Sequence, residues 1–519
     1  MINNWWVTRP KRKLTSVPED LAVVATAALN QEWEGARGLH LKVEEGLEAS
    51  GLKREGERRD QGGGGGRTYV AWLKSLGLLF TQKSTRRLTL TLAGEELLDG
   101  RNPTQILTNQ IFKYQFPSAF SISRGVEVSP RFRIRPFRFL FRLLLDDRIQ
   151  YLTQDEMAKI VITEAENESD KCFNEIVNRI LDFRERGDSC LPDDFEERYP
   201  STRRGVKTTA AERLNDVANT FINWMEYTQY IIREDGGRIR IHPEMVEYVQ
   251  SEFLYNPPLI DRCEDEEFFQ RKYGVDPWHN KDVRNLINTP TVTAVVIAKS
   301  KVRQAFLAYA ASHPVLAVNS EVVNHIVSST GISYRIVEDA LGEMFPRGAF
   351  GSFLPAYIEM AYSGKDQATQ FELATASLFQ TVFGFATRHV GQLGKTPDVL
   401  LLSDNDGYQA ILDNKAYSSY SITNDHMNRM VVNYIQGLQS YSSFHCPLAF
   451  FSYIAGGFSP GIDKGIAAIR ERTGVNGAAM SAGRLSNLMI RHLEHPYSHA
   501  NLKDIFSVNR QVVLSDFDR

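Results

Sequence analysis

The chain has 519 residues, of which 42% are hydrophobic and 24% charged, and its formal net charge is −3. These values indicate a soluble chain of about three or four domains. No run of about eighteen apolar residues occurs, so we expect no membrane-spanning helix. The polar N-terminal segment lacks the apolar core of a secretory signal, which predicts a cytoplasmic protein.

The cysteines and histidines show none of the spacings that hold a metal. Four cysteines are scattered without a CxxC pair, at Cys172, Cys190, Cys263 and Cys446. In a cytoplasmic protein they are expected to be reduced thiols, and they predict no zinc site. The eleven histidines form no HExxH pattern, and no GxxxxGKS/T phosphate loop is present. We therefore expect neither zinc chemistry nor ATP-driven motion.

The N-terminal part of the chain predicts a helix, a strand pair and a second helix. The first helix covers 67–80, the alternation at 87–92 indicates a strand, and the next helix begins at Ala93. This order is typical of a winged helix with Arg86 and Arg87 at the tip of the wing. Basic residues at such tips contact DNA phosphates and grooves. A small packing domain without a ligand is the alternative.

Glycines mark both ends of the first of these helices. Gly77 is a helix C-cap signal. The tract 62–66, which follows a charged run, predicts a flexible loop that could order on DNA, although a plain linker is equally consistent with it.

A basic stretch and a second strand pair follow. Arginines alternate with apolar and aromatic residues in 131–142, a pattern that favours a phosphate-facing surface backed by a core. The arginines concerned are Arg131, Arg133, Arg135, Arg138 and Arg142. A helix at 211–221 and strands at 230–233 and 238–242 predict a second wing. A solvated amphipathic element is the alternative for any single arginine.

Residues 256–350 are expected to form a helical connector. Two helices, 320–327 and 334–341, are separated by the turn SSTGIS and resemble a helix-turn-helix pair. A structural connector is favoured over a DNA contact for this pair.

The C-terminal part carries the residues with the clearest chemistry. An amphipathic helix covers 371–383, with Glu372 near its start and off the apolar stripe. The strands VLLL and YQAIL then flank the hairpin signal SDNDG, which brings Asp398, Asp413 and Lys415 to one end of a hairpin. Asp413 and Lys415 are two residues apart on a strand, so both point to the same face.

Two carboxylates beside an ammonium suit metal-assisted attack of water on a phosphodiester. Asp398 and Asp413 would hold Mg²⁺. Lys415 would orient or deprotonate the water and offset charge on the phosphate. The alternative is a solvated hairpin with a surface ion pair.

The order helix, hairpin, helix, strand, strand, helix resembles the PD-(D/E)XK nuclease fold. More narrowly, 371–490 resembles the FokI cleavage domain. The matching pieces are Glu372 at the helix start, RHVG at 388–391, PD at 397–398, DNKAYS at 413–418, FFSYIAGGF at 450–458 and NGAAMS at 476–481.

The resemblance implies an α/β nuclease with Mg²⁺ as cofactor and DNA as substrate. It implies that Asp398 and Asp413 are the metal ligands, Lys415 the catalytic lysine and Glu372 an accessory carboxylate. The dimer helix of the family carries an Asp and an Arg one turn apart. Asp425 and Arg429 resemble that pair if the loop after KAYS is shorter here than in the family. This resemblance implies a transient homodimer.

Residues 5–280 resemble the recognition half of AlwI-type endonucleases and related nicking enzymes. The resemblance rests on the order of several short motifs: Trp5, Arg9, Pro10, WEG at 33–35, LTLTLAGEELLDGRNP at 88–103 and FKYQFPS at 112–118. It implies reading of a short asymmetric site in double-stranded DNA, and the family implies a cognate DNA methyltransferase.

We therefore expect a multidomain protein with mainly α, winged-helix-like DNA-recognition modules and a C-terminal α/β PD-(D/E)XK nuclease domain. The expected boundaries are 1–118 and 119–255 for the two modules, 256–350 for the connector and 351–519 for the nuclease. The expected activity is that of a type IIS restriction endonuclease that cuts at a fixed distance from its site. The alternatives are a strand-specific nicking enzyme and a catalytically silent winged-helix regulator.

Overall fold

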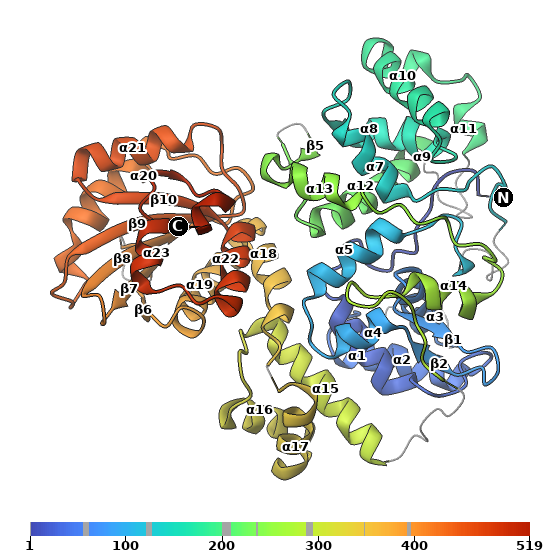
Figure 1. Ribbon diagram of the computed structural model, residues 1–519, viewed down its shortest axis with the longest axis horizontal. Helices are drawn as coiled ribbons and strands as arrows, with labels where there is room; N and C mark the ends of the chain where they lie inside the picture. The colour runs from blue at the N-terminus through green and yellow to red at the C-terminus, as the bar shows by residue number, and fades with distance from the viewer. Residues whose placement is uncertain are drawn as a thin grey trace. The chain divides into compact units, whose positions relative to one another are not determined.

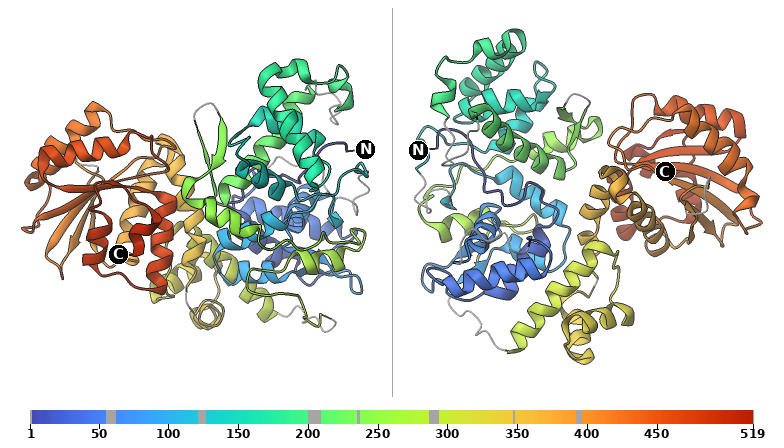
Figure 2. Two further views of the ribbon diagram at one scale, coloured as in Figure 1. Left: turned by 45° about the horizontal axis from the view of Figure 1, so that its top comes forward. Right: turned by 180° about the vertical axis from the view of Figure 1, so that it is seen from behind.

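The computed structural model describes residues 2–54, 62–120, 127–199, 209–234, 237–286, 294–346, 348–391 and 396–518. The chain divides into two compact units (Figures 1 and 2). The N-terminal unit comprises Met1–Tyr309 with Ala317–Gly351, and the C-terminal unit comprises Ala310–Leu316 with Ser352–Arg519. No described helix is both long and apolar enough to span a membrane.

The N-terminal unit begins with three helices, a hairpin and two further helices. Their bounds are α1 Val17–Ala28, α2 Arg37–Ala49, α3 Gly64–Ser75, β1 Leu79–Thr81, β2 Leu88–Leu90, α4 Leu92–Leu98 and α5 Pro103–Lys113. Strands β1 and β2 pair antiparallel. Gly77 ends the first predicted helix in the left-handed conformation, with φ +72°. The predicted order of helix, strand pair and helix is thus confirmed, but the predicted helix 67–80 was too long, because α3 ends at Ser75 and Leu79 and Phe80 belong to β1.

The glycine tract differs from the predicted loop, because Gly64, Gly65 and Gly66 lie in the first turn of α3. Close packing explains the difference. A Cβ atom on Gly66 would lie 2.2 Å from the backbone oxygen of His40 in α2. Glycine is therefore needed for helix α3 to approach helix α2, and flexibility is not its role at this position.

The rest of the N-terminal unit is mainly helical. Its main elements are α7 Pro136–Leu145, β3 Leu152–Thr153, α10 Asp170–Arg186, α12 Ala210–Tyr227, β4 Ile231–Arg233, β5 Arg238–Ile241, α13 Val246–Glu252 and α14 Glu266–Tyr273. The second predicted strand pair is present as β4 and β5, and β3 joins it in the order β3-β5-β4. Aromatic side chains fill the core, where Phe137 stacks on Trp224 with ring centroids 5.5 Å apart.

Helix α14 returns to the elements at the start of the chain. Gln270 Nε2 donates to the backbone oxygen of Lys74 at 2.7 Å, and the Tyr273 hydroxyl donates to that of Ser75 at 3.1 Å. The first expected module is therefore completed by residues that follow the second one in sequence.

The connector contains the long helix α15 Ala294–Ser312 and the predicted helix pair, α16 Ser320–Thr330 and α17 Tyr334–Met344. Gly331 separates the pair with φ +69°, a C-cap conformation that glycine adopts without strain.

The C-terminal unit contains a six-stranded sheet in the order β11-β10-β9-β8-β7-β6. The strands are β6 Ala386–His389, β7 Val399–Ser403, β8 Tyr408–Asn414, β9 Leu448–Ala455, β10 Asn476–Ser481 and β11 Arg510–Gln511. Strands β6, β7 and β8 pair antiparallel, and the remaining pairs are parallel. An α/β architecture in this part of the chain agrees with the predicted class.

Helices cover both faces of this sheet (Figure 1). One face packs on α20 Asn424–Asn428, the π-helix 429–436 and α21 Ile462–Thr473. The other packs on α19 Ala368–Thr381, α22 Ala482–Glu494 and α23 His499–Ile505, and α18 Leu354–Tyr362 packs on α19 and α22. Strand residues alternate between these layers, so Ile411 belongs to the core beneath α21, whereas Asn414 bonds to α19.

Candidate active site

The predicted hairpin brings the two aspartates together. Strands β7 and β8 pair with Val399 opposite Leu412, so Asp398, just before β7, lies beside the end of β8. Asp398 Oδ2 accepts a hydrogen bond of 2.6 Å from the backbone N–H of Asn414. The turn closes with the Gly407 N–H donating to the Ser403 oxygen at 2.9 Å, and Gly407 has φ +63°. The two aspartates therefore meet at the open end of the hairpin.

Lys415, which directly follows β8, joins this group. Its ammonium lies 2.7 Å from Asp413 Oδ2, and the two side chains are only 16% and 4% exposed. Burial alone would lower the pKa of the Lys415 ammonium, but the charges of Asp413 and Asp398 outweigh burial and raise it above its ordinary value. Lys415 is therefore a buried cation among carboxylates.

The opposite holds for Asp398. Burial, and then the charge of Asp413, raises the pKa of the Asp398 carboxyl well above its ordinary value, although Lys415 acts to lower it. The charge of the neighbouring Asp413 thus disfavours the ionised form of Asp398. A positive ion between them would relieve this repulsion, and catalytic sites commonly contain such strained charge pairs.

Glu372 reaches the same site from α19. Its Oε2 lies 2.8 Å from Nε2 of His389 on β6. Gly391 lies between the carboxylates, because a Cβ atom added there would lie 3.1 Å from Glu372 Oε2 and 3.3 Å from Asp398 Oδ1. All four residues predicted for catalysis are thus close to one another or to shared neighbours. His389 and Gly391 lie in the RHVG motif at 388–391, but the motif alone does not indicate their contacts with the carboxylates.

One polar atom of the site has no partner. Asp413 Oδ1 is buried and accepts no hydrogen bond from any described residue. A buried carboxylate oxygen without a partner is costly, and native structures usually provide it with a donor, a water or an ion. This oxygen is therefore available to a ligand.

The residues expected at the dimer surface lie on one exposed helix. Asp425 in α20 and Arg429 at the start of the π-helix form an ion pair of 2.8 Å, and their side chains are 65% and 53% exposed. The chain therefore satisfies this pair internally, as helix neighbours commonly do.

The arginines predicted to contact DNA fall into two groups. Arg86 is exposed and Arg87 half-buried at the tip of the β1–β2 hairpin, and neither side chain forms an ion pair with a described residue. Arg86 has φ +57°, a turn conformation.

The second group has partners within the chain. Arg131 donates to Glu166 at 2.9 Å, and Arg133 pairs with Asp261 at 2.8 Å. Arg135 is only 7% exposed and pairs with Glu168 at 2.5 Å. Their assignment as DNA contacts stays a prediction, and it competes with a structural role.

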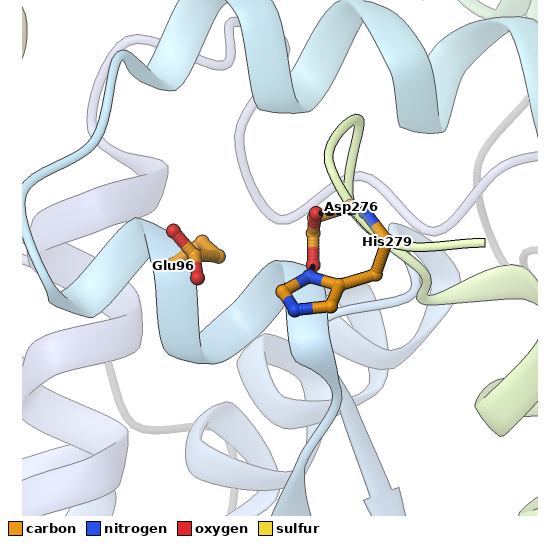
Figure 3. A group of neighbouring side chains, drawn as sticks. All are labelled: Glu96, Asp276 and His279. Atoms are coloured by element: carbon orange, nitrogen blue, oxygen red, sulfur yellow. Dashed lines mark hydrogen bonds and ion pairs between the residues drawn. The ribbon is translucent and has the colours of Figure 1, made fainter. Parts of the chain in front are cut away.

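A second group of possible metal ligands lies in the N-terminal unit (Figure 3). Glu96 on α4 and Asp276 and His279 after α14 can bring one ligand atom each within 4.8 Å of the others. Each already has a partner: His279 Nδ1 lies 2.7 Å from Asp276 Oδ2, and Glu96 pairs with Arg101 at 3.0 Å. Sequence patterns do not indicate this group because Glu96 lies far in sequence from Asp276 and His279, and its contacts fix the loop after α14.

Comparisons with known proteins divide the chain into two matched regions. Residues 331–513 match the family model described as FokI, cleavage domain, and residues 74–289 match the model described as AlwI restriction endonuclease. The first region contains all four predicted catalytic residues, and the second contains both wing-tip arginines. No curated protein matches the chain.

Three solved structures are also similar. The restriction endonuclease FokI is 13% identical, covers 98% of this chain and 100% of its own, and has a TM-score of 0.29. FokI bound to DNA is 13% identical over 99% of this chain and 100% of its own, also with a TM-score of 0.29. The BpuJ1 endonuclease binding domain, in complex with pyrene- and phenanthrene-modified DNA, is 16% identical over 53% of this chain and 96% of its own, with a TM-score of 0.35.

Proposed function

We propose that this chain, a type IIS restriction endonuclease that joins an AlwI-type region to a FokI-type cleavage domain, cuts DNA at a fixed distance from a short asymmetric site. The N-terminal unit would read the site, and the C-terminal unit would hydrolyse the phosphodiester bond. The observation that carries the proposal is the buried group of Asp398, Asp413, Lys415 and Glu372 within the region that matches the FokI cleavage domain.

The carboxylates of the C-terminal unit fit a divalent cation. Asp413 Oδ1 has no hydrogen-bond partner among the described residues, and the missing side chain of Gly391 leaves room beside Asp398 and Glu372. Oxygen ligands of this kind suit Mg²⁺. We propose that Asp398 and Asp413 hold it, with Glu372 as an accessory carboxylate. When bound, Mg²⁺ would supply positive charge to the scissile phosphate and help to activate water.

Lys415 would act on the phosphate as a cation. Its ammonium is held beside Asp413 at 2.7 Å, and its raised pKa keeps it charged at neutral pH. A buried positive charge stabilises the negative charge that builds up on the phosphate in the transition state. Orientation of the attacking water by the Nζ hydrogens is compatible with this role, whereas proton abstraction requires a neutral amine. The charged state therefore favours charge stabilisation.

We propose the PD-(D/E)XK fold for the C-terminal unit and winged-helix modules for the N-terminal unit. The first proposal is supported by the hairpin that carries Asp398 and Asp413 inside a mixed sheet with helices on both faces. The second is supported by the succession α3, β1, β2, α4 and by the exposed Arg86 at the tip of that strand pair. The domain boundaries given above belong to the same proposal, with helix α14 added to the first module.

A double-strand break requires two cutting events, because one such site hydrolyses one strand at a time. We propose that two nuclease domains pair transiently on DNA through the helix that carries Asp425 and Arg429. Such a small helical surface buries too little area for a stable dimer in solution. A methyltransferase of the same specificity would protect the host's own sites. A strand-specific nicking enzyme is the alternative outcome.

The test is cleavage of plasmid DNA with and without Mg²⁺, followed by sequencing of the product ends. Mg²⁺-dependent linear product with ends at a constant offset from one short sequence supports the proposal. Open-circular product identifies a nicking enzyme. Ends at random positions, or cleavage in the presence of a chelator, contradict the proposal.

A further inference from the structure

A chain of buried hydrogen bonds joins the end of β8 to helices α19 and α18. Asn414 Nδ2 donates to Thr375 Oγ1 at 2.6 Å, and Thr375 Oγ1 lies 2.9 Å from the hydroxyl of Tyr357. Thr375 and Tyr357 are fully buried, and Asn414 is 7% exposed. Polar groups buried in a core of this kind require partners, and the Tyr357 hydroxyl and the Asn414 amide nitrogen find theirs in Thr375 Oγ1.

The direction of each hydrogen bond follows from the number of hydrogens available. The Thr375 hydroxyl donates its single hydrogen to the backbone oxygen of Phe371 at 2.8 Å. Its oxygen can then only accept, so both the Tyr357 hydroxyl and the Asn414 amide donate to it. Asn414 Oδ1 has no partner among the described residues. The Asn414 Nδ2 also lies 3.5 Å from the backbone oxygen of Phe371, so the amide is held mainly by the shorter bond to Thr375.

Asn414 lies between two residues of the proposed active site. Successive strand residues point to opposite faces, so Asp413 and Lys415 face the site while Asn414 faces α19. The backbone N–H of Asn414 also donates to Asp398. A rotation or shift of this residue would thus move Asp413, Lys415 and the bond to Asp398 together.

Thr375 is also tied to the fourth residue of the site. It lies three positions after Glu372 in α19, so the two share one side of the helix. The Thr375–Asn414 bond therefore links the helix that carries Glu372 to the strand that carries Asp413 and leads directly into Lys415.

We propose that Thr375, supported by Tyr357, is a positioning residue of the nuclease site. By holding Asn414 it fixes the separation between Glu372 and the Asp413–Lys415 pair. Small changes in this distance slow catalysis strongly, since a displacement of about 1 Å can slow a reaction by about 100-fold. This inference rests on the proposed function, because Thr375 is given the role of positioning the carboxylates of the proposed nuclease site.

The test compares two substitutions at one position in the full-length protein. Thr375→Val keeps the shape but removes the hydroxyl, and Thr375→Ser keeps the hydroxyl but removes the methyl group. Thr473→Val is the matched control, because Thr473 Oγ1 donates to the Ile469 oxygen at 2.8 Å in α21, away from the site. The measurements are the single-turnover cleavage rate, the dissociation constant for Mg²⁺ by calorimetry without DNA, and the affinity for site-containing DNA.

Thr375→Val is expected to slow cleavage by about 10- to 100-fold and to weaken Mg²⁺ binding several-fold, with unchanged DNA affinity. Thr375→Ser should stay within about 3-fold of wild type in both quantities, because the acceptor oxygen is retained. The inference is overturned if Thr375→Val and Thr375→Ser have the same cleavage rate and Mg²⁺ affinity, or if Thr375→Val changes them no more than Thr473→Val does. Should Thr375→Val not fold, Tyr357→Phe replaces it and should change both quantities in the same direction by a smaller factor.

Failure of this inference and failure of the proposed function give different results. If Asp413→Asn is inactive while Thr375→Val matches its control, the site is correct and the positioning role is wrong. If Asp413→Asn cleaves as wild type does, the proposed site itself is wrong, and the positioning role fails with it.

Discussion

The backbone N–H of Asn414 donates a hydrogen bond of 2.6 Å to Asp398 Oδ2. This bond ties the first carboxylate of the site to the residue that separates Asp413 from Lys415. Because the donor is a backbone group, no side-chain substitution at position 414 removes it. Asp413 and Lys415 can therefore be varied one at a time without loss of this bond, whereas a substitution of Asp398 removes its acceptor.

Asp413→Asn should abolish cleavage and leave DNA binding nearly unchanged. The substitution removes a ligand charge from the proposed metal site, and loss of several kcal/mol of transition-state stabilisation corresponds to at least about 10³-fold in rate. Asp404→Asn, at the exposed turn of the same hairpin, is the control and should cleave normally. Cleavage by Asp413→Asn within about tenfold of wild type would contradict the assignment.

Lys415→Gln should change two quantities in opposite directions. Removal of the ammonium beside Asp413 leaves the carboxylates without a countercharge, so Mg²⁺ should bind more tightly by calorimetry. Cleavage should nevertheless fall by about 100-fold or more, because the phosphate loses a stabilising charge. Lys464→Gln at an exposed position of α21 is the matched control. Weaker Mg²⁺ binding by Lys415→Gln would indicate a different role for this lysine.

Arg86→Ala and Arg87→Ala should each weaken DNA binding and make it less dependent on salt. Each arginine that contacts a phosphate contributes about one unit to the slope of the logarithm of affinity against the logarithm of salt concentration. Titrations of a site-containing duplex at several salt concentrations measure this slope, with thermal denaturation as a check on folding.

Arg135→Ala provides the contrast. Arg135 is buried and paired with Glu168, so its removal leaves that carboxylate without its countercharge, with only the backbone N–H of residue 135 as donor, and should destabilise the fold by about 3 kcal/mol. If Arg135→Ala instead kept full stability and lost only DNA affinity, the arginine would be a DNA contact. If Arg86→Ala and Arg87→Ala both kept the wild-type dependence of DNA affinity on salt concentration, the β1–β2 hairpin would not contact DNA phosphates.

Stability should depend on pH through Lys113. Burial lowers the pKa of this lysine to about 7 from 10.5, although Asp276 acts to raise it. The unfolded chain therefore binds more protons than the folded chain between these values. The stability associated with the neutral amine is fully present above the unfolded pKa and is lost as pH falls towards 7.

Lys113→Met should accordingly stabilise the protein at pH 7 by roughly 2–4 kcal/mol and flatten the stability curve between pH 7 and 10. Denaturant unfolding at several pH values measures this, with Lys42→Met at an exposed site of α2 as the control. Parallel curves for wild type and Lys113→Met would show that the lysine does not titrate in this range.

Arg429→Ala should leave nicked intermediates if two nuclease domains pair through this helix. Cleavage by wild type should then rise more than proportionally with enzyme concentration, because pairing is bimolecular. Arg472→Ala, an exposed arginine on α21, is the control. A rate of double-strand cleavage per enzyme that is independent of concentration would rule out transient pairing.

Features with a local cause could be predicted from the sequence. The hairpin of Asp398 and Asp413 follows from two apolar runs around an Asp-Gly turn, and the strand alternation places Asp413 and Lys415 together. The end of α3 at Gly77 follows from the same kind of short-range rule.

Contacts between layers could not be predicted. The bond from Asn414 to Thr375 joins residues far apart in sequence, and no periodicity indicates it. The alternation in 131–142 correctly indicates a buried apolar side. It does not indicate that Arg131 and Arg135 pair with acids elsewhere in the chain, at Glu166 and Glu168. Likewise, glycines typical of a loop lie in α3 because His40 packs against them.

The turn between β7 and β8 offers a position where the chain could be opened for engineering. Asp404, Asn405, Asp406 and Gly407 are exposed. They lie at the far end of the hairpin from Asp398, about 15 Å away along a five-residue strand. A peptide tag, or a ligand-gated domain with closely spaced termini, could be inserted there without entering the reaction centre. Insertion of the ligand-gated domain would give a nuclease in which an added small molecule changes the stability of the sheet.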